Sequence, residues 1–302
     1  MASSRSDPFR YRLLRRALLG LSAILGHLSW RGTQRLGRGI GRIGWHLARR
    51  DRRRTLEHLR IAFPELSERD RRALGRASFR HHGQTLTECL HLMSKSCEDI
   101  GRVVQVEGWE HVEEARRVGR PILVFTGHCG NWELIGAAAN CRGLGLRPVA
   151  REVEDTGLQR LLLSFRERFG TYGIARGGKA AARELLASVR GGGALAMLID
   201  QDTKVEGVWV PFFGRPAFTP VGAARLAAKL GAAALPTFIE RRPDGTHRVT
   251  FHAPLDLPED ATEATARMTA TIEAQIRRHP EQWVWMHRRW RRQPAGTDTI
   301  AG

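Results

Sequence analysis

The pattern of apolar and polar positions changes near residue 100. Residues 1 to 95 read as mostly helical, and Ser67 followed by Asp70 is the pattern of a capping box that begins a long helix. After residue 100, short apolar runs with strand character alternate with helical segments. This alternation predicts an α/β fold with a mainly parallel central sheet flanked by helices.

The predicted strands are short, and a helical segment follows most of them. The strand segments are 103–108, 121–127, 146–150, 172–175, 194–200, 208–214, 234–240 and 247–254. Helices are expected to begin near Trp109, Asn131, Gly157, Gly178, Thr219 and Ala261, and the last is expected to reach Trp290. The segment "VPFFGRPAFTP" is expected to form a rigid, proline-flanked turn that leads into a helix.

The chain shows no internal repeat and no low-complexity linker, so we expect a basic N-terminal region over 1–48 and one α/β domain over 49–302. The apolar run Ala17–Trp30 has fourteen residues. It is shorter than the roughly 20 that cross a bilayer. Arginines flank this run on both sides, which is typical of a helix that lies on an anionic membrane surface. The alternatives are a helix that packs on the domain and a short, tilted span.

Charge and cysteine content narrow the classes of partner and compartment. The chain has 49 Lys plus Arg against 31 Asp plus Glu, a net charge of +18, which favours an acidic partner unless the arginine excess reflects coding bias. Residues 1–60 hold fifteen arginines and three acidic residues, so most of this excess is regional. The four cysteines are too few and too irregularly spaced for a disulfide framework or a paired zinc site, which fits a reducing compartment.

The segment "FTGHCGNWELIG", residues 125–136, follows a predicted strand and leads into a helix. Ligands of open α/β sheets bind at the carboxyl ends of strands, where this segment places His128. We expect Asn131 to cap the helix and Glu133 to lie in its first turn. A carboxylate that holds one ring nitrogen leaves the other free as a base, so His128 and Glu133 are predicted to activate a hydroxyl together.

Other segments offer competing chemistry. Cys129 is a possible thiolate nucleophile, but neighbouring residues that leave a strand point to opposite sides, so His128 is poorly placed to deprotonate it. The segment 173–180 has P-loop spacing but carries Ala180 where a Mg²⁺-binding hydroxyl is needed. No metal-ligand cluster is apparent. The two carboxylates of "LIDQDTK" do not by themselves indicate a function. The segment "HPEQWVWMHRRWRR" fits two interpretations, which are a strip of tryptophans and arginines that binds nucleic acid and a helix with a tryptophan-rich inner face.

The ordered set "AFPELSERD", "TGHCGNWE", "DQD", "VPFFGRPAFT", "ARLA" and "HPEQWVWMHRRW" resembles the bacterial lipid A biosynthesis (lauroyl/myristoyl) acyltransferase family. That family is related to the glycerol-3-phosphate and lysophospholipid acyltransferases, which implies a fold of that type. The resemblance implies His128 as general base and Glu133 as its partner. It also implies substrate contacts, and the residues concerned are Asn131, Arg151, Asp200 and Arg215.

The resemblance further implies the reaction and its location. A fatty acyl group would pass from an acyl carrier protein or CoA thioester to a hydroxyl of a membrane glycolipid, most simply a lipid A precursor, at the cytoplasmic face of the inner membrane. An anionic membrane surface would be a partner, nucleic acid would not, and no cofactor is required because the thioester is already activated. A lysophospholipid or a phosphatidylinositol mannoside is an alternative acceptor. A cysteine-dependent thioester hydrolase and a basic nucleic-acid-binding protein are the competing classes.

Overall fold

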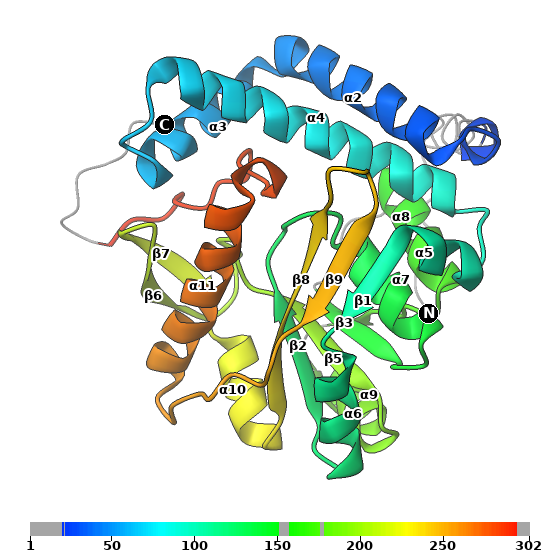
Figure 1. Ribbon diagram of the computed structural model, residues 1–302. Helices are drawn as coiled ribbons and strands as arrows, with labels where there is room; N and C mark the ends of the chain where they lie inside the picture. Colours follow the sequence, from blue (N-terminus) through cyan, green and yellow to red (C-terminus); the bar gives the residue numbers. More distant parts are fainter. Residues whose placement is uncertain (1–19, 21, 151–156, 176–177, 295–302) are drawn as a thin grey trace, which may run out of the picture.

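A seven-stranded sheet lies at the centre of the computed structural model, which describes residues 20, 22–150, 157–175 and 178–294 (Figure 1). Its strands are β1 (Val104–Glu107), β2 (Ile122–Thr126), β3 (Leu146–Ala150), β4 (Ile174–Ala175), β5 (Ala194–Leu198), β8 (Ala233–Arg241) and β9 (His247–Phe251). They are ordered β1-β9-β8-β2-β5-β3-β4, and only β8 and β9 pair antiparallel. The predicted mainly parallel α/β sheet is confirmed.

Helices surround this sheet on both faces and at one end. They are α2 (Trp30–Leu47), α3 (Arg49–Ala62), α4 (Glu68–Leu92), α5 (Cys97–Val103), α6 (Trp109–Arg117), α7 (Glu133–Cys141), α8 (Gly157–Arg168), α9 (Gly178–Arg190), α10 (Gly222–Leu230), α11 (Ala261–Arg278) and the 3₁₀ turn η1 (Pro280–Gln282). Alternate residues of β2 enter different cores: Leu123 and Phe125 pack with α10 and α11, whereas Ile122 and Val124 pack with α5 and α7. Burial on both faces explains why this strand is a continuous apolar run.

Helices α2 and α4 form an outer layer that crosses one end of the sheet (Figure 1). Ser67 caps α4 by accepting a hydrogen bond from the Asp70 backbone N–H at 3.1 Å, as expected. A Cβ on Gly41 would collide with the Phe79 carbonyl, so glycine permits the close approach of α2 to α4. Within the described ranges, no helix is both long and apolar enough to cross a bilayer.

Three sequence-based expectations in the C-terminal half need correction. The strand predicted over 208–214 is present as β6 (Gly207–Phe212), but the segment expected as a turn continues into a second strand, β7 (Arg215–Pro220), which pairs with β6 as a hairpin. The next helix, α10, begins at Gly222 rather than near Thr219. The last long helix ends at Arg278 instead of Trp290. Pro280 explains this end, because a proline disfavours helical geometry in the residue before it. After η1 the chain runs without regular structure to the end of the described residues.

Cys97 and Cys141 form a disulfide that links the first residue of α5 to the last residue of α7, with their Cα atoms 5.4 Å apart. The cysteine spacing gave no indication of this bond, because 44 residues separate the two positions in sequence. Helix packing alone brings them together. The absence of a disulfide framework therefore does not exclude a single bridge.

Candidate active site

His128 and Asp200 follow two neighbouring strands. His128 lies two residues after β2, and Asp200 lies two residues after β5. The two strands pair in parallel with Thr126 opposite Leu198, so their carboxyl ends meet at one edge of the sheet. This is the edge at which ligands of open α/β sheets bind.

The Asp200 carboxylate holds His128 at two points. His128 Nδ1 lies 2.6 Å from Asp200 Oδ1, and the His128 backbone N–H donates to Oδ2 at 2.7 Å. An ionised carboxylate only accepts hydrogen bonds, so Nδ1 carries the ring proton and Nε2 is left as an acceptor. The arrangement is that of a histidine poised as a general base.

Asp200 is buried, and its ionised form is nonetheless favoured. Burial alone raises the pKa of its carboxyl. The electrostatic interaction with the His128 ring and the hydrogen bonds from His128 and Trp283 outweigh burial and hold the pKa of this carboxyl well below its ordinary value of 3.8. The carboxylate therefore stays charged at neutral pH, as the Nδ1–H tautomer requires.

Two glycines explain the backbone around His128. A Cβ on Gly127 would lie 3.0 Å from Asp200 Oδ2, so glycine leaves room for the carboxylate. Gly130 has φ of 62°, and a Cβ there would collide with the Ile239 carbonyl. The left-handed conformation turns the chain toward α7 and is readily adopted only without a side chain.

The expected pairing of Glu133 with His128 is corrected by the structure. Glu133 accepts two hydrogen bonds from Arg166 of α8, both at 2.7 Å, and one from the Trp132 indole at 3.1 Å. No hydrogen bond joins Glu133 to His128 within the described residues. The helix start directs Glu133 toward α8, and Asp200 takes the place beside the ring. Glu133 contacts His128 only indirectly. It accepts a hydrogen bond from Trp132, and the Trp132 ring packs against the His128 ring with the ring centroids 5.0 Å apart.

Asn131 does not cap α7, which begins at Glu133 after Trp132 without a side-chain cap. Its buried side-chain amide instead donates to Glu88 of α4 at 3.1 Å, because the turn faces α4. This contact joins the His128 turn to the outer helical layer. It leaves Asn131 no exposed surface for a substrate.

Two other predicted substrate contacts have different outcomes. Arg151 lies outside the described residues. Arg215 is an exposed residue at the start of β7, and no contact within the described ranges links its side chain to His128. Its role in binding stays a prediction.

Cys129 is buried and belongs to the core rather than to an open site. Burial, and then the nearby charge of Asp200, raise the pKa of its thiol well above the ordinary value. A thiol in this environment stays protonated, whereas nucleophilic cysteines have a lowered pKa. The surroundings of Cys129 therefore argue against the thioester-hydrolase alternative.

Trp283 is a site residue that sequence reasoning missed. Its indole N–H donates to Asp200 Oδ2 at 2.7 Å, so it fixes the carboxylate that holds His128. The only signal was the tryptophan-rich C-terminal segment, which suggested a helix face or a stacking strip. Trp283, Trp285 and Trp290 are all buried, so none of them offers a ring face on which a base could stack.

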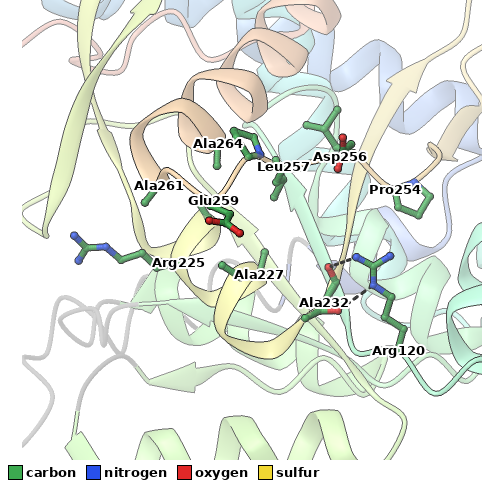
Figure 2. A pocket seen from close by; sticks show the side chains of 15 residues that line it. Arg120, Arg225, Ala227, Ala232, Pro254, Asp256, Leu257, Glu259, Ala261 and Ala264 are labelled. Carbon is green, nitrogen blue, oxygen red and sulfur yellow. Dashed lines mark hydrogen bonds between the residues drawn. The ribbon is translucent and has the colours of Figure 1, made fainter.

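Two cavities adjoin the sheet, one at the carboxyl ends of β2 and β5 and one at the opposite edge. A narrow, largely apolar one adjoins Trp132, Glu133 and Arg166 under α7 and α8. A cavity of about 550 Å³ lies between α10 and the segment that leads into α11. There Arg120 donates to the Gly231 and Ala232 carbonyls (Figure 2). Arg120 precedes β2 and Ala232 precedes β8, so this cavity is at the edge of the sheet opposite His128.

Among the residues that the structure describes, no group of three or more His, Cys, Asp or Glu side chains is arranged to hold a metal ion. Asp200 and Asp202, the carboxylates that sequence left undecided, have other partners. Asp200 binds His128 and Trp283, and Asp202 accepts from Arg292 Nε at 2.7 Å.

The amino-acid sequence of this chain is similar to those of known acyltransferases. The family described as bacterial lipid A biosynthesis acyltransferase matches residues 9–292. The chain is 27% identical over 292 residues to a lipid A biosynthesis lauroyltransferase of Escherichia coli (strain K12), an alignment that covers 92% of this chain and 91% of that one. It is 25% identical to a lipid A biosynthesis acyltransferase of Haemophilus influenzae, with 88% and 82% covered. It is 26% identical to a phosphatidylinositol mannoside acyltransferase of Mycobacterium tuberculosis, with 71% and 69% covered.

Proposed function

The chain belongs to the bacterial lipid A biosynthesis acyltransferase family, and from this we propose that it transfers a fatty acyl group from a carrier-protein or CoA thioester to a hydroxyl of a lipid A precursor. Acyl transfer to a lipid A-like acceptor follows from the family and its named relatives. The identity of the donor and the roles of individual residues are our proposals.

The hydrogen bonds of His128 to Asp200 carry the proposed mechanism. His128 Nε2 removes the proton of the acceptor hydroxyl while the oxygen attacks the thioester carbonyl. The carbon–sulfur bond then breaks, and the imidazolium gives the proton to the sulfur, so that the donor leaves as a free thiol. Asp200 holds the ring in the required tautomer and stabilises the imidazolium that forms. Glu133 supports the ring indirectly, because it holds Trp132 and anchors α8 through Arg166.

The acceptor is the point at which the relatives differ. The lipid A enzymes align over more of the chain than the phosphatidylinositol mannoside enzyme does. We therefore favour a lipid A precursor, with a phosphatidylinositol mannoside or a lysophospholipid as the second candidate. Purified protein should be incubated with an acyl carrier protein or CoA thioester and each acceptor in turn, and the lipids analysed by mass spectrometry. Acylation of none of them would overturn the proposed function.

Cys129→Ser is expected to retain most of the activity, because His128 and not the thiol performs the chemistry and the change replaces one atom in a buried turn. Intact-protein mass spectrometry of the wild type with donor alone should find no acyl-enzyme. The matched control is Cys89→Ser, which alters the other buried free cysteine. An acyl adduct on Cys129 that is passed on to the lipid would overturn direct transfer.

We also propose that the protein acts at the cytoplasmic face of the inner membrane, where it would meet both thioester donors and lipid acceptors. The first part of the run Ala17–Trp30 lies outside the described residues, and Leu25 near its end is buried against Leu90 of α4. Ile24 and Leu28 of this run are exposed, and the exposed apolar surface continues along α2. Four side chains form the part on α2, and they are Leu36 (41% exposed), Ile40 (36%), Ile43 (60%) and Leu47 (76%).

These four positions, which we call the α2 stripe, recur every three or four residues and so share one side of the helix. The opposite side packs on α4 through Gly37 and Gly41. Arg35 and Arg42 are exposed on another side of α2. An apolar stripe with arginines beside it, on the outermost layer of the molecule (Figure 1), suits an anionic lipid surface.

Ile43→Ser with Leu47→Ser is expected to weaken sedimentation with phosphatidylglycerol vesicles about tenfold or more, since it removes the two most exposed apolar side chains of the stripe. Removing residues 1–48 is a less clean test, because it would uncover α4. The matched control is Val118→Ser with Leu186→Ser, which alters exposed apolar residues of other elements. Equal loss of binding in both double variants would contradict a specific role of α2.

A further inference from the structure

We infer that a basic cavity beside His128 binds a phosphate group carried by one of the two substrates. The cavity has a volume of about 340 Å³ and is lined by Arg54, Gln201, Asp202, His287, Arg288 and Arg291. This inference rests on the proposed function, which it deepens by assigning the site that would orient a substrate.

The cavity adjoins the reacting centre. The His287 ring lies 5.6 Å from the His128 ring, centroid to centroid. Gln201 directly follows Asp200 in sequence, and its side-chain nitrogen lies 2.9 Å from His287 Nε2. A group bound in the cavity would therefore sit within a few ångströms of the atoms that act on the hydroxyl and the thioester.

Three arginines and one aspartate are among the residues that line the cavity. The aspartate, Asp202, accepts hydrogen bonds from the Arg292 backbone N–H at 3.0 Å and from Arg292 Nε at 2.7 Å, and it also pairs with Arg291 at 3.5 Å. Arg288 is exposed, and its guanidinium makes no hydrogen bond or ion pair with any residue that the structure describes. Arg54 donates to the Met286 carbonyl at 2.9 Å and pairs with Asp51 at 3.3 Å, which keeps a second guanidinium at the cavity, so the unpaired charge there belongs to Arg288.

The irregular C-terminal segment holds these groups in place. Arg289, which directly follows Arg288, is fully buried and donates to the Phe218 carbonyl at 2.7 Å and to Thr219 Oγ1 at 2.6 Å. Because Arg289 anchors the segment on β7, the segment can leave its neighbours His287 and Arg288 exposed at the cavity. A continuous helix over this segment would not impose this division between a buried arginine and an exposed one.

A phosphate is the ligand that this chemistry fits. Guanidinium groups match the geometry of phosphate oxygens and form charge-assisted hydrogen bonds with them. The reaction offers two sources of phosphate: the head group of the glycolipid acceptor and the phosphopantetheine arm of the thioester donor. Both present the same group to the cavity, so substrates that lack it distinguish the two.

Arg288→Gln tests the inference, with Arg190→Gln as the control because Arg190 is exposed on α9 at the amino ends of the strands. With both phosphates present, Arg288→Gln is expected to lower kcat/KM by about 10- to 100-fold, mainly through KM. The kcat/KM of Arg288→Lys should lie between those of the wild type and Arg288→Gln, because lysine keeps the positive charge but lacks the planar guanidinium group. The control should stay near the wild-type value.

The assay is then repeated with phosphatase-treated acceptor, and separately with an S-acyl pantetheine donor in place of S-acyl phosphopantetheine. The penalty of Arg288→Gln should vanish in one arm, and that arm identifies the source of the phosphate. A penalty that is absent throughout, or that persists in both arms, would overturn the inference. If the wild type transfers no acyl group at all, the proposed function fails, and binding of inorganic phosphate decides the inference separately. It stands if phosphate raises the Tm of the wild type but not of Arg288→Gln, and falls otherwise.

Discussion

Asp200→Asn is expected to lower kcat for acyl transfer by about 10³- to 10⁴-fold with little change in KM. The asparagine oxygen would take the place of Oδ2, which accepts from the His128 backbone N–H and from Trp283. Its NH₂ group would then face His128 Nδ1, which must accept a hydrogen bond and cannot carry the proton. The proton moves to Nε2, and the base is lost.

Kinetics of purified variants, with circular dichroism as the check on folding, measure this effect. His128→Ala should be at least as damaging, and the double variant should be little worse than the worse single one, because the two residues act as a unit. Asp256→Asn is the matched control. Asp256 is exposed at the cavity between α10 and the segment that leads into α11, at the edge of the sheet opposite His128.

Glu133→Gln separates the two carboxylates. Because Glu133 contacts Arg166 and Trp132 rather than the His128 ring, this variant should reduce kcat less than Asp200→Asn does. If Glu133→Gln abolished activity while Asp200→Asn retained it, the assignment of Asp200 as the positioning residue would be wrong.

Arg241→Met is expected to lower the free energy of unfolding by about 3–5 kcal/mol, because it leaves a buried carboxylate without its partner. Glu88 is fully buried and accepts from Arg241 Nε at 2.9 Å and from Nη2 at 2.7 Å. Glu88 also accepts from Asn131, so the variant should disturb the turn that carries His128. Urea denaturation measures the loss, and Arg242→Met, which alters the half-buried neighbour whose side chain bonds only Gln105 among the described residues, should change stability far less.

The neutral pair Glu88→Gln with Arg241→Met should be more stable than Arg241→Met alone, because no buried charge remains.

Acid titration of the wild type and of Glu88→Gln gives a second measure of the contribution of Glu88 to stability. Burial raises the pKa of Glu88, but the charges of Arg241 and His247 outweigh it, so the pKa lies well below the ordinary 4.5. Such a group stabilises the fold above its ordinary pKa and loses that contribution as pH falls. Wild-type stability should therefore fall more steeply than that of Glu88→Gln between about pH 6 and pH 3.

Local patterns were sufficient for most of the fold. The apolar run 121–127 predicts β2, and Ser67 predicts the start of α4, because strand burial and helix capping depend on neighbours in sequence. The run 208–214 predicts β6, but β7 and its pairing with β6 were not predicted, since the prolines and aromatic residues of this segment also suit a turn. The end of α11 was missed because the tryptophan-rich segment after Pro280 was also compatible with a helix, whereas its tryptophans fill a core that no local pattern reveals.

The sequence by itself determined the α/β class, the position of His128 at the end of a strand, and, through an ordered set of motifs, the resemblance to a family of acyltransferases. Each of these depends on residues that are close in the chain. Only the tertiary structure decided which carboxylate holds His128. Glu133 is five residues away and Asp200 is 72, and proximity in sequence favoured Glu133. The pairing of β2 with β5 brings Asp200 to the ring, whereas the first turn of α7 directs Glu133 to Arg166. Sheet order and helix packing join residues that are distant in the chain, and no spacing rule contains that information.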